Sequence, residues 1–218
     1  MVTDESLASH PGKSSPLRVR VFVDFWNFQL SVNRARTSNF RVDWKILGPR
    51  LTREVQRIDL GPSNDHPLQF DGMHVYLSYN ASTEAGRKLK QWALNSLDRF
   101  PGVQVIAKAR KRKRAPKCPK CNQEIIQCPH CGASTEGTLE KGVDTAIVTD
   151  MIKLAWAGAF DIAVLVSSDA DFVPAVQFLD SKGFRVIQGG FPPRGIDLAR
   201  TCWAAIDLAK ILNEVERA

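Results

Sequence analysis

The sequence lacks several features that mark common classes of protein. No apolar run among the 218 residues is long enough to cross a membrane as a helix. No Gly-rich loop of the Walker type is present, which argues against a phosphotransfer enzyme built on that loop. Residues 1–16 are polar and carry no apolar h-region, so we expect a disordered tail rather than a secretory signal, and a cytoplasmic location.

Positive charge, in contrast, is plentiful and concentrated in one block. Of the 30 Lys and Arg residues, seven lie in residues 108–117, and the remaining 23 equal the 23 Asp and Glu residues. The seven are Lys108, Arg110, Lys111, Arg112, Lys113, Arg114 and Lys117. A charge that serves solubility is spread over a surface, whereas such a block can bind an anionic polymer such as nucleic acid. A solvated loop is the alternative.

Strand-like and helix-like segments alternate along most of the chain. We predict strands over residues 17–23, 73–79, 103–107, 162–167 and 184–188. We predict helices over residues 25–36, 43–58, 82–100, 143–157, 172–181 and 203–215. This alternation predicts an α/β domain at 17–215, with a mostly parallel sheet of five or slightly more strands between two layers of helices. Residues 108–140 interrupt the pattern as an insertion.

Carboxylates follow two of the predicted strands. Asp24 ends the first strand, and Asp169 and Asp171 follow the strand at 162–167. Ligands of open α/β sheets bind beyond the carboxyl ends of the strands, where the strand order reverses. If these two strands are neighbours there, the three carboxylates repel one another, and a divalent cation relieves that repulsion. Mg²⁺ or Mn²⁺ suits such an all-oxygen site.

The helix predicted from residue 143 supplies a fourth carboxylate. At about 100° per residue, its apolar side chains form an arc centred near Asp144, which places this residue toward the sheet in the first turn. Asp150 lies on the flank of the same arc. We therefore expect Asp144 to be a direct ligand and Asp150 an outer-shell ligand. Asp169 has an alternative role as the N-cap of the helix that follows it.

Four cysteines in the insertion have the spacing of metal ligands. Two C-x-x-C pairs, separated by six residues, match a closed tetrahedral zinc site formed by Cys118, Cys121, Cys128 and Cys131. Disulfides are the alternative, which a reducing compartment disfavours, and His130 could replace one cysteine. We expect this zinc ribbon to hold the basic block beside the acidic site. Cys202 lies in an apolar segment and is predicted to be a buried hydrophobic residue.

Aromatic residues follow the first predicted strand directly. Phe25, Trp26 and Phe28 come within four residues of Asp24. Aromatic side chains at such positions usually belong to the core. Alternatively, one of them, with Trp26 the first candidate, stacks on an unpaired base.

Three short motifs in this order resemble the NYN domain, a branch of the PIN-like nucleases, in its LabA-like bacterial form. They are Val23–Asp24–x–x–Asn27, Lys141–Gly142–Val143–Asp144 with Asp150 further on, and Val166–Ser167–Ser168–Asp169–x–Asp171–Phe172. The resemblance spans residues 18–212. It implies a three-layer α/β/α sandwich and a metal-dependent endoribonuclease.

The resemblance also implies roles for single residues. Asp24, Asp144, Asp169 and Asp171 would bind Mg²⁺ or Mn²⁺. Asn27 would support the first-strand carboxylate and orient the substrate, Ser167 would act near the attacking water, and Lys141 would contact a substrate phosphate. The expected substrate is single-stranded RNA, with DNA left open, and the expected products carry a 5′-phosphate and a 3′-hydroxyl. The alternative is a non-catalytic adaptor that binds nucleic acid through the basic block and the zinc ribbon.

Overall fold

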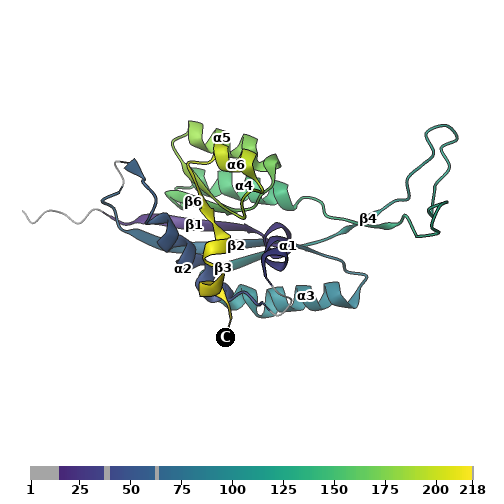
Figure 1. Ribbon diagram of the computed structural model, residues 1–218, viewed down its shortest axis with the longest axis horizontal. Helices are drawn as coiled ribbons and strands as arrows, with labels where there is room; N and C mark the ends of the chain where they lie inside the picture. Colours follow the sequence, from purple (N-terminus) through teal and green to yellow (C-terminus); the bar gives the residue numbers. More distant parts are fainter. Residues whose placement is uncertain (1–14, 37–39, 62–63, 218) are drawn as a thin grey trace, which may run out of the picture.

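A single six-stranded sheet forms the centre of the molecule (Figure 1). The computed structural model describes residues 15–36, 40–61 and 64–217, so nearly all of the predicted tail lies outside the described residues. The strands are β1 (Leu17–Asp24), β2 (Leu68–Tyr79), β3 (Val103–Ala109), β6 (Ile162–Val166), β7 (Arg185–Gly190) and β8 (Ala204–Asp207). Their order is β3-β2-β1-β6-β7-β8, and all five neighbouring pairs are parallel.

Helices cover both faces of the sheet, as predicted (Figure 1). One layer contains α1 (Phe25–Ala35), α2 (Trp44–Val55) and α3 (Glu84–Asn95). The other contains α4 (Val143–Trp156), α5 (Val173–Ser181) and α6 (Ile196–Thr201). No helix of the described residues is both long and apolar enough to cross a membrane.

Each layer of helices encloses its own hydrophobic core, and β1 shows why. Successive side chains of a strand point to opposite faces. Val21 and Val23 therefore enter the core beneath α1, α2 and α3, whereas Phe22 enters the core beneath α4, α5 and α6. All three side chains are fully buried. Because both faces are covered, β1 consists of nearly continuous apolar residues from Val21 until Asp24 ends it.

The predicted helix at 203–215 is wrong. The segment forms the edge strand β8, followed by the short 3₁₀ helices η4 (Leu208–Lys210) and η5 (Leu212–Val215). Ile206, Leu208 and Leu212 all pack into the first core. A short apolar segment has no decisive period, and here pairing with β7 makes the first four residues a strand. The sheet consequently has six strands.

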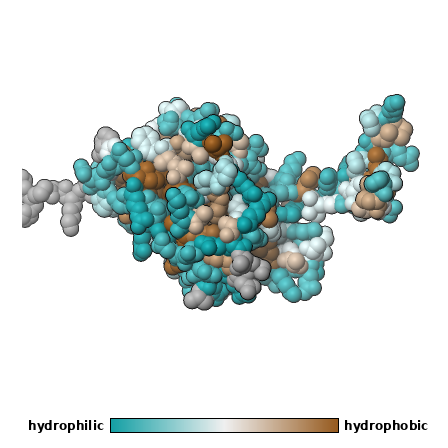
Figure 2. All heavy atoms as spheres, viewed as in Figure 1, coloured by the Kyte–Doolittle hydropathy of each residue, from teal (hydrophilic) through white to brown (hydrophobic). Residues whose placement is uncertain are grey.

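The insertion leaves the sheet as an arm (Figure 1). Its base is a two-stranded antiparallel ladder of β4 (Lys111–Lys113) and β5 (Gly137–Leu139). Figure 2 shows that the outer part of the arm is mostly hydrophilic and stands clear of the body of the domain. The arm returns to the sheet layer directly before α4.

Candidate acidic site at the carboxyl ends of the strands

The carboxyl ends of β1 and β6 form the switch point of the sheet. These strands are parallel neighbours, and Val23 pairs with Val166. After β1 the chain enters α1 on one face, whereas after β6 it continues to α5 on the other. Asp24 and Ser167 directly follow the paired residues. The two motifs that were predicted to meet are therefore side by side, at the position where open α/β sheets bind ligands.

Asp24 is buried at the centre of this site, with 5% of its surface exposed. Its Oδ1 atom accepts a hydrogen bond from the backbone N–H of Asn27 at 3.2 Å, which caps α1, and its Oδ2 atom accepts one from the Ser167 hydroxyl at 3.3 Å. Burial raises the pKa of Asp24 to about 6, and the charges of Asp144 and Glu140 add to this rise. The ionised form of the Asp24 side chain is therefore disfavoured by its surroundings.

Asp144 approaches the same site from α4. The helix begins after Gly142, whose φ of 80° lies in the left-handed region that glycine adopts without strain. Burial raises the pKa of Asp144, and the charges of Asp169, Glu140 and Asp171 raise it further. The structure therefore brings Asp24, Asp144, Asp169 and Asp171 into one electrostatic group.

The loop after β6 is held by hydrogen bonds from three directions. The backbone N–H of Asp169 donates to the Ser167 hydroxyl at 3.2 Å, and that of Ser168 donates to Asn27 Oδ1 at 3.0 Å. The buried Gln188, on β7, donates from Nε2 to the Ser167 carbonyl at 3.0 Å. Sequence reasoning missed Gln188, because a single glutamine in a strand gives no functional signal. These bonds fix the loop against both α1 and β7.

Asp169 also has the capping role that was its alternative. Its Oδ1 atom accepts from the backbone N–H of Asp171 at 3.0 Å and begins the 3₁₀ turn η3 (Ala170–Phe172). Capping and cation binding are compatible because a carboxylate has two oxygens and about four acceptor positions. Asp171, in the first turn of η3, is exposed.

Glu140 is a fifth carboxylate that sequence reasoning missed. It raises the pKa of both Asp24 and Asp144, accepts a hydrogen bond from the Ser78 hydroxyl, and lies 3.7 Å from Arg110 Nη2. The residue lies at the end of the insertion, where no periodicity guides a prediction. Its position directly before the Lys141–Gly142–Val143–Asp144 motif was the available signal.

Asp150 occupies a different position. It lies six residues after Asp144 on α4, which corresponds to about 9 Å along the helix. Its Oδ2 atom accepts a hydrogen bond from the hydroxyl of Tyr76, on β2, at 2.9 Å. Burial and the charge of Asp150 raise the pKa of that hydroxyl. Asp150 thus anchors α4 to the sheet beside the acidic group.

The first part of the basic block lies next to this site. Arg110 Nε donates to the Ser78 hydroxyl at 2.9 Å, and its guanidinium lies 5.2 Å from the centroid of the Trp26 ring. Trp26 Nε1 donates to the Ser78 carbonyl at 2.7 Å, so the ring is held in place and half-buried. Lys141, directly before α4, is exposed. This rim can attract phosphate groups.

The remaining basic residues divide between the sheet and the arm. Lys108 is half-buried on β3, opposite Ser78 on β2. The residues of the arm are exposed: Lys111, Arg112, Lys113, Arg114 and Lys117. Arg112 Nη2 pairs with Glu136 Oε1 across the base of the arm at 2.5 Å. The predicted block is therefore not one surface, since only its first residues lie near the carboxylates.

The two C-x-x-C pairs form two separate hairpin turns in tandem. The Cys118 thiol accepts backbone hydrogen bonds from Cys121 and Lys120, and Cys128 is held in the same way by Cys131 and His130; these bonds lower the pKa of each first thiol. All four cysteines are free. The four thiols are not gathered into one metal-binding cluster within the described part of the chain, so the zinc ribbon stays a prediction.

Cys202 follows its prediction. Only 8% of its surface is exposed, and burial raises the pKa of its thiol to about 12. It packs in the core beneath α4, α5 and α6. Cys202 is therefore a buried hydrophobic residue.

The acidic group fits Mg²⁺ or Mn²⁺ by its donor chemistry. Among the described residues, no three His, Cys, Asp or Glu side chains are gathered closely enough to form a complete ligand set. Mg²⁺ does not require one, because it commonly binds one or two carboxylates and fills its other positions with water and substrate phosphate. Burial first, and the neighbouring carboxylates second, raise the pKa of Asp24 and of Asp144, and a bound cation would stabilise the ionised form of both.

The parallel fold and its acidic rim define a PIN-like α/β domain. The model of the family described as NYN domain matches residues 18–209, and the chain belongs to this family. NYN domains are typically nucleases, so membership in the family implies a nuclease function. A solved structure of similar fold is that of a protein of unknown function from Vibrio parahaemolyticus, with 17% identity, coverage of 89% of this chain and 95% of that chain, and a TM-score of 0.48. No curated protein matches the chain.

Proposed function

We propose that this protein is a metal-dependent endoribonuclease that cleaves single-stranded RNA, in the LabA-like branch of the NYN family. One observation carries the proposal. Asp24, Asp144, Asp169 and Asp171 come from three separate segments at the switch point of the sheet: the charges of Asp169 and Asp171 help to raise the pKa of Asp144, and the charge of Asp144 helps to raise the pKa of Asp24. A fold gains no stability by collecting like charges there, whereas a site for a cation and a phosphodiester requires them.

Asp24, Asp144, Asp169 and Asp171 would hold the cation, one or two of them directly and the others through its bound waters, and Asp150, which binds the Tyr76 hydroxyl, would lie in the outer shell. When bound, Mg²⁺ or Mn²⁺ supplies neutralisation of the phosphate charge and a water of lowered pKa for in-line attack. Ser167 and Asn27 orient Asp24 and the 167–169 loop, which holds the carboxylates in register. The products would carry a 5′-phosphate and a 3′-hydroxyl.

The basic and aromatic groups at the rim would bind the strand. Arg110 and Lys141 are placed to contact phosphates, a contact that is independent of sequence and weakens with salt. Trp26, held through its indole N–H, can present its ring to an unpaired base. Stacking on a base requires an unpaired nucleotide, so these residues favour single-stranded RNA.

A cleavage assay tests the proposal. Labelled single-stranded RNA should be cut in Mn²⁺ and left intact when a chelator is added. Asp169→Asn should reduce the rate by about 10–100-fold, because it removes one charged oxygen ligand. Its capping bond survives, since Asn caps as well as Asp does. Cleavage that continues unchanged in both conditions would contradict the proposal.

The adaptor is the second candidate, and the exposed arm is the observation that favours it. Six exposed basic residues lie on the arm, away from the carboxylates. An adaptor would bind the same RNA in the absence of divalent metal and leave it intact in Mn²⁺. The two candidates therefore give opposite results in one assay.

We also propose that the arm binds structural zinc, which places the protein in a reducing compartment such as the cytoplasm. The support is the pair of C-x-x-C turns, whose backbone N–H groups already stabilise thiolates. Folding the hairpins against each other would bring Cys118, Cys121, Cys128 and Cys131 together in tetrahedral geometry.

Zinc removal should weaken RNA binding without unfolding the sheet. We expect one zinc ion per chain in the wild-type protein and none in the Cys118→Ser variant. The variant should bind RNA about tenfold more weakly at low salt, because the basic residues of the arm lose their fixed arrangement. The melting temperature of the domain should stay the same. His130→Ala is the matched control and should retain zinc; unchanged RNA affinity in Cys118→Ser would remove this role.

A further inference from the structure

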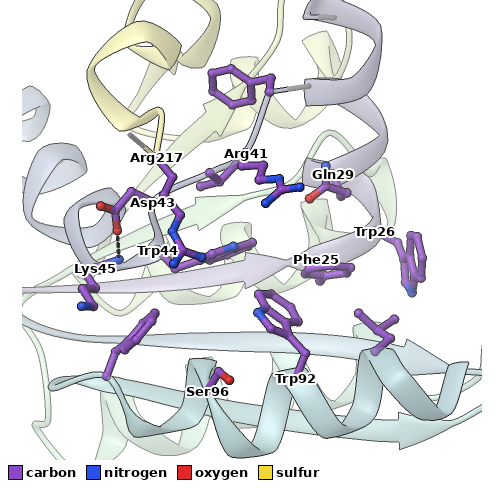
Figure 3. A pocket seen from close by; sticks show the side chains of 14 residues that line it. Phe25, Trp26, Gln29, Arg41, Asp43, Trp44, Lys45, Trp92, Ser96 and Arg217 are labelled. Carbon is purple, nitrogen blue, oxygen red and sulfur yellow. Dashed lines mark hydrogen bonds between the residues drawn. The ribbon is translucent and has the colours of Figure 1, made fainter. Parts of the chain in front are cut away.

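A pocket of about 740 Å³ opens on the face opposite α4, between the three helices of the first layer (Figure 3). Phe25, Trp26 and Gln29 line it from α1, and Trp92 and Ser96 from α3 and its end. The remaining side of the pocket is formed by residues 40–43, which lead into α2, together with Arg217. Its size is that of pockets that bind a small molecule or a nucleotide.

The walls of the pocket are aromatic. The Trp44 ring stacks on Phe25 with centroids 5.8 Å apart, and Trp92 packs against both, at 6.3 Å from Trp44 and 6.2 Å from Phe25. Trp92 and Phe100 are only half-buried, so part of each ring faces the opening. These aromatic walls alone would suit a fully apolar ligand. The charged residues at the rim favour a ligand that also has a charged part.

Three cations surround the opening. Arg41, Lys45 and Arg217 are all exposed and all line the pocket. The backbone fixes two of them, since the N–H of Arg217 donates to the Arg41 carbonyl at 2.7 Å. One carboxylate, Asp43, also lines the pocket, and its Oδ1 atom accepts from the Lys45 backbone N–H at 2.9 Å as the cap of α2. The rim is therefore positive, and its ligand should carry negative charge.

The pocket reaches the acidic site through α1. Asp24 is followed directly by Phe25 and Trp26, and both of these line the pocket. Trp26 in turn contacts Arg110, which lies beside Glu140 at the acidic group. A strand whose phosphodiester lies at the carboxylates can thus place a neighbouring nucleotide in the pocket. Trp26 lies between the two positions.

We propose that this pocket binds one unpaired nucleotide of the RNA strand, with its base against the half-buried rings of Trp92 and Phe100 and its phosphate at the cationic rim. Aromatic rings can stack on the face of a base, and cations can bind the phosphate, so the pocket has partners for both parts of a nucleotide. Gln29 and Ser96 can hydrogen-bond to the edge of the base. The inference rests on the proposed function for its RNA, but its site is distinct from the carboxylates.

Binding of a fluorescent single-stranded RNA without divalent metal tests the pocket apart from cleavage. Trp92→Ala and Arg41→Ala should each weaken binding about tenfold, and Trp92→Phe should recover most of the loss, because a ring remains for stacking. Trp156→Ala and Arg200→Ala are matched controls: Trp156 is exposed on α4 and Arg200 on α6, and neither should change affinity. Arg41 is exposed, so its variant folds even if Trp92→Ala does not.

An abasic RNA series locates the nucleotide. One abasic position should lower wild-type affinity about tenfold and have no further effect in Trp92→Ala. A free nucleoside monophosphate should compete only weakly. Unchanged affinity in Arg41→Ala and in Trp92→Ala, or no sensitive position in the abasic series, would overturn the proposed nucleotide site. Tight binding of the free nucleotide with unaltered RNA affinity would also overturn it. If RNA binds through the pocket but stays intact in Mn²⁺, the proposed nuclease activity is refuted, whereas the proposed nucleotide site stands.

Discussion

Asp24→Asn is expected to abolish RNA cleavage and, at the same time, to stabilise the fold. Cleavage should fall by about 10³-fold or more, because the buried centre of the acidic group loses its charge. The substitution preserves the shape of the side chain and the cap of α1 at Asn27. A loss of activity can therefore be assigned to charge rather than to unfolding.

The gain in stability follows from the raised pKa of Asp24. Because the folded state holds this proton up to a pKa of about 6, against an ordinary value of 3.8, ionisation of Asp24 opposes folding. The penalty is absent below about pH 4, grows between pH 4 and 6, and amounts to about 3 kcal/mol at neutral pH. Asn escapes this penalty, so the variant should be about 1–3 kcal/mol more stable at pH 7 and equal to wild type at pH 4.

Denaturant unfolding at both pH values measures this effect, with cleavage assayed in parallel. Asp207→Asn is the matched control, since Asp207 also ends a strand and caps a 3₁₀ helix, through Ala209 N–H at 3.1 Å, but on the edge strand β8. It should keep full activity. Asp24→Asn protein that still cuts RNA, or that is less stable than wild type at pH 7, would contradict the proposed site.

Phe22→Ala should cost about 3–5 kcal/mol of folding stability. Phe22 is fully buried on β1, stacks on His74 with centroids 5.5 Å apart, and meets Phe160 edge-on at 5.7 Å. Its removal leaves a cavity beneath α4, which the neighbouring strands cannot fill. For a domain of this size, the melting temperature should fall by about 6–20 °C.

The same substitution should reduce cleavage at temperatures where the protein is still folded, because α4 carries Asp144. Calorimetry and the cleavage assay at 20 °C measure the two effects. Phe178→Ala provides the control, since that ring is 39% exposed on α5 and its loss should change stability by less than about 1 kcal/mol. An equal loss in both variants would show that the core beneath α4 has no special role.

The parts of the site that were predictable lie next to regular elements. Asp24 and Asp169 follow buried strands, and Asp144 begins a helix whose apolar arc is visible in the sequence. The carboxyl ends of parallel strands meet at one edge of the sheet, so the sequence predicted that these carboxylates lie close together. Glu140 follows an insertion without periodicity, and it acts through contacts with Ser78 and Arg110 that only the folded chain provides.

Two other features were beyond the sequence for different reasons. The strand β8 has four residues, and its apolar pattern is also that of a helix; pairing with β7 decides between them. The aromatic pocket combines Phe25, Trp44 and Trp92 from three helices. Each of these residues alone predicts only a core position. Phe25 and Trp44 are indeed buried, and no local pattern indicates that Trp92 stays half-exposed beside them.

The base of the arm has a consequence for engineering of the domain. The chain leaves the sheet after Arg110 and returns at Glu140, and the ladder of Lys111–Lys113 with Gly137–Leu139 holds these two points together. An insertion whose ends meet imposes little strain on its host, and closing a shorter loop there costs even less entropy. We therefore expect that joining the two sides with a tight turn would leave a folded domain, and that another segment could be placed at the same point.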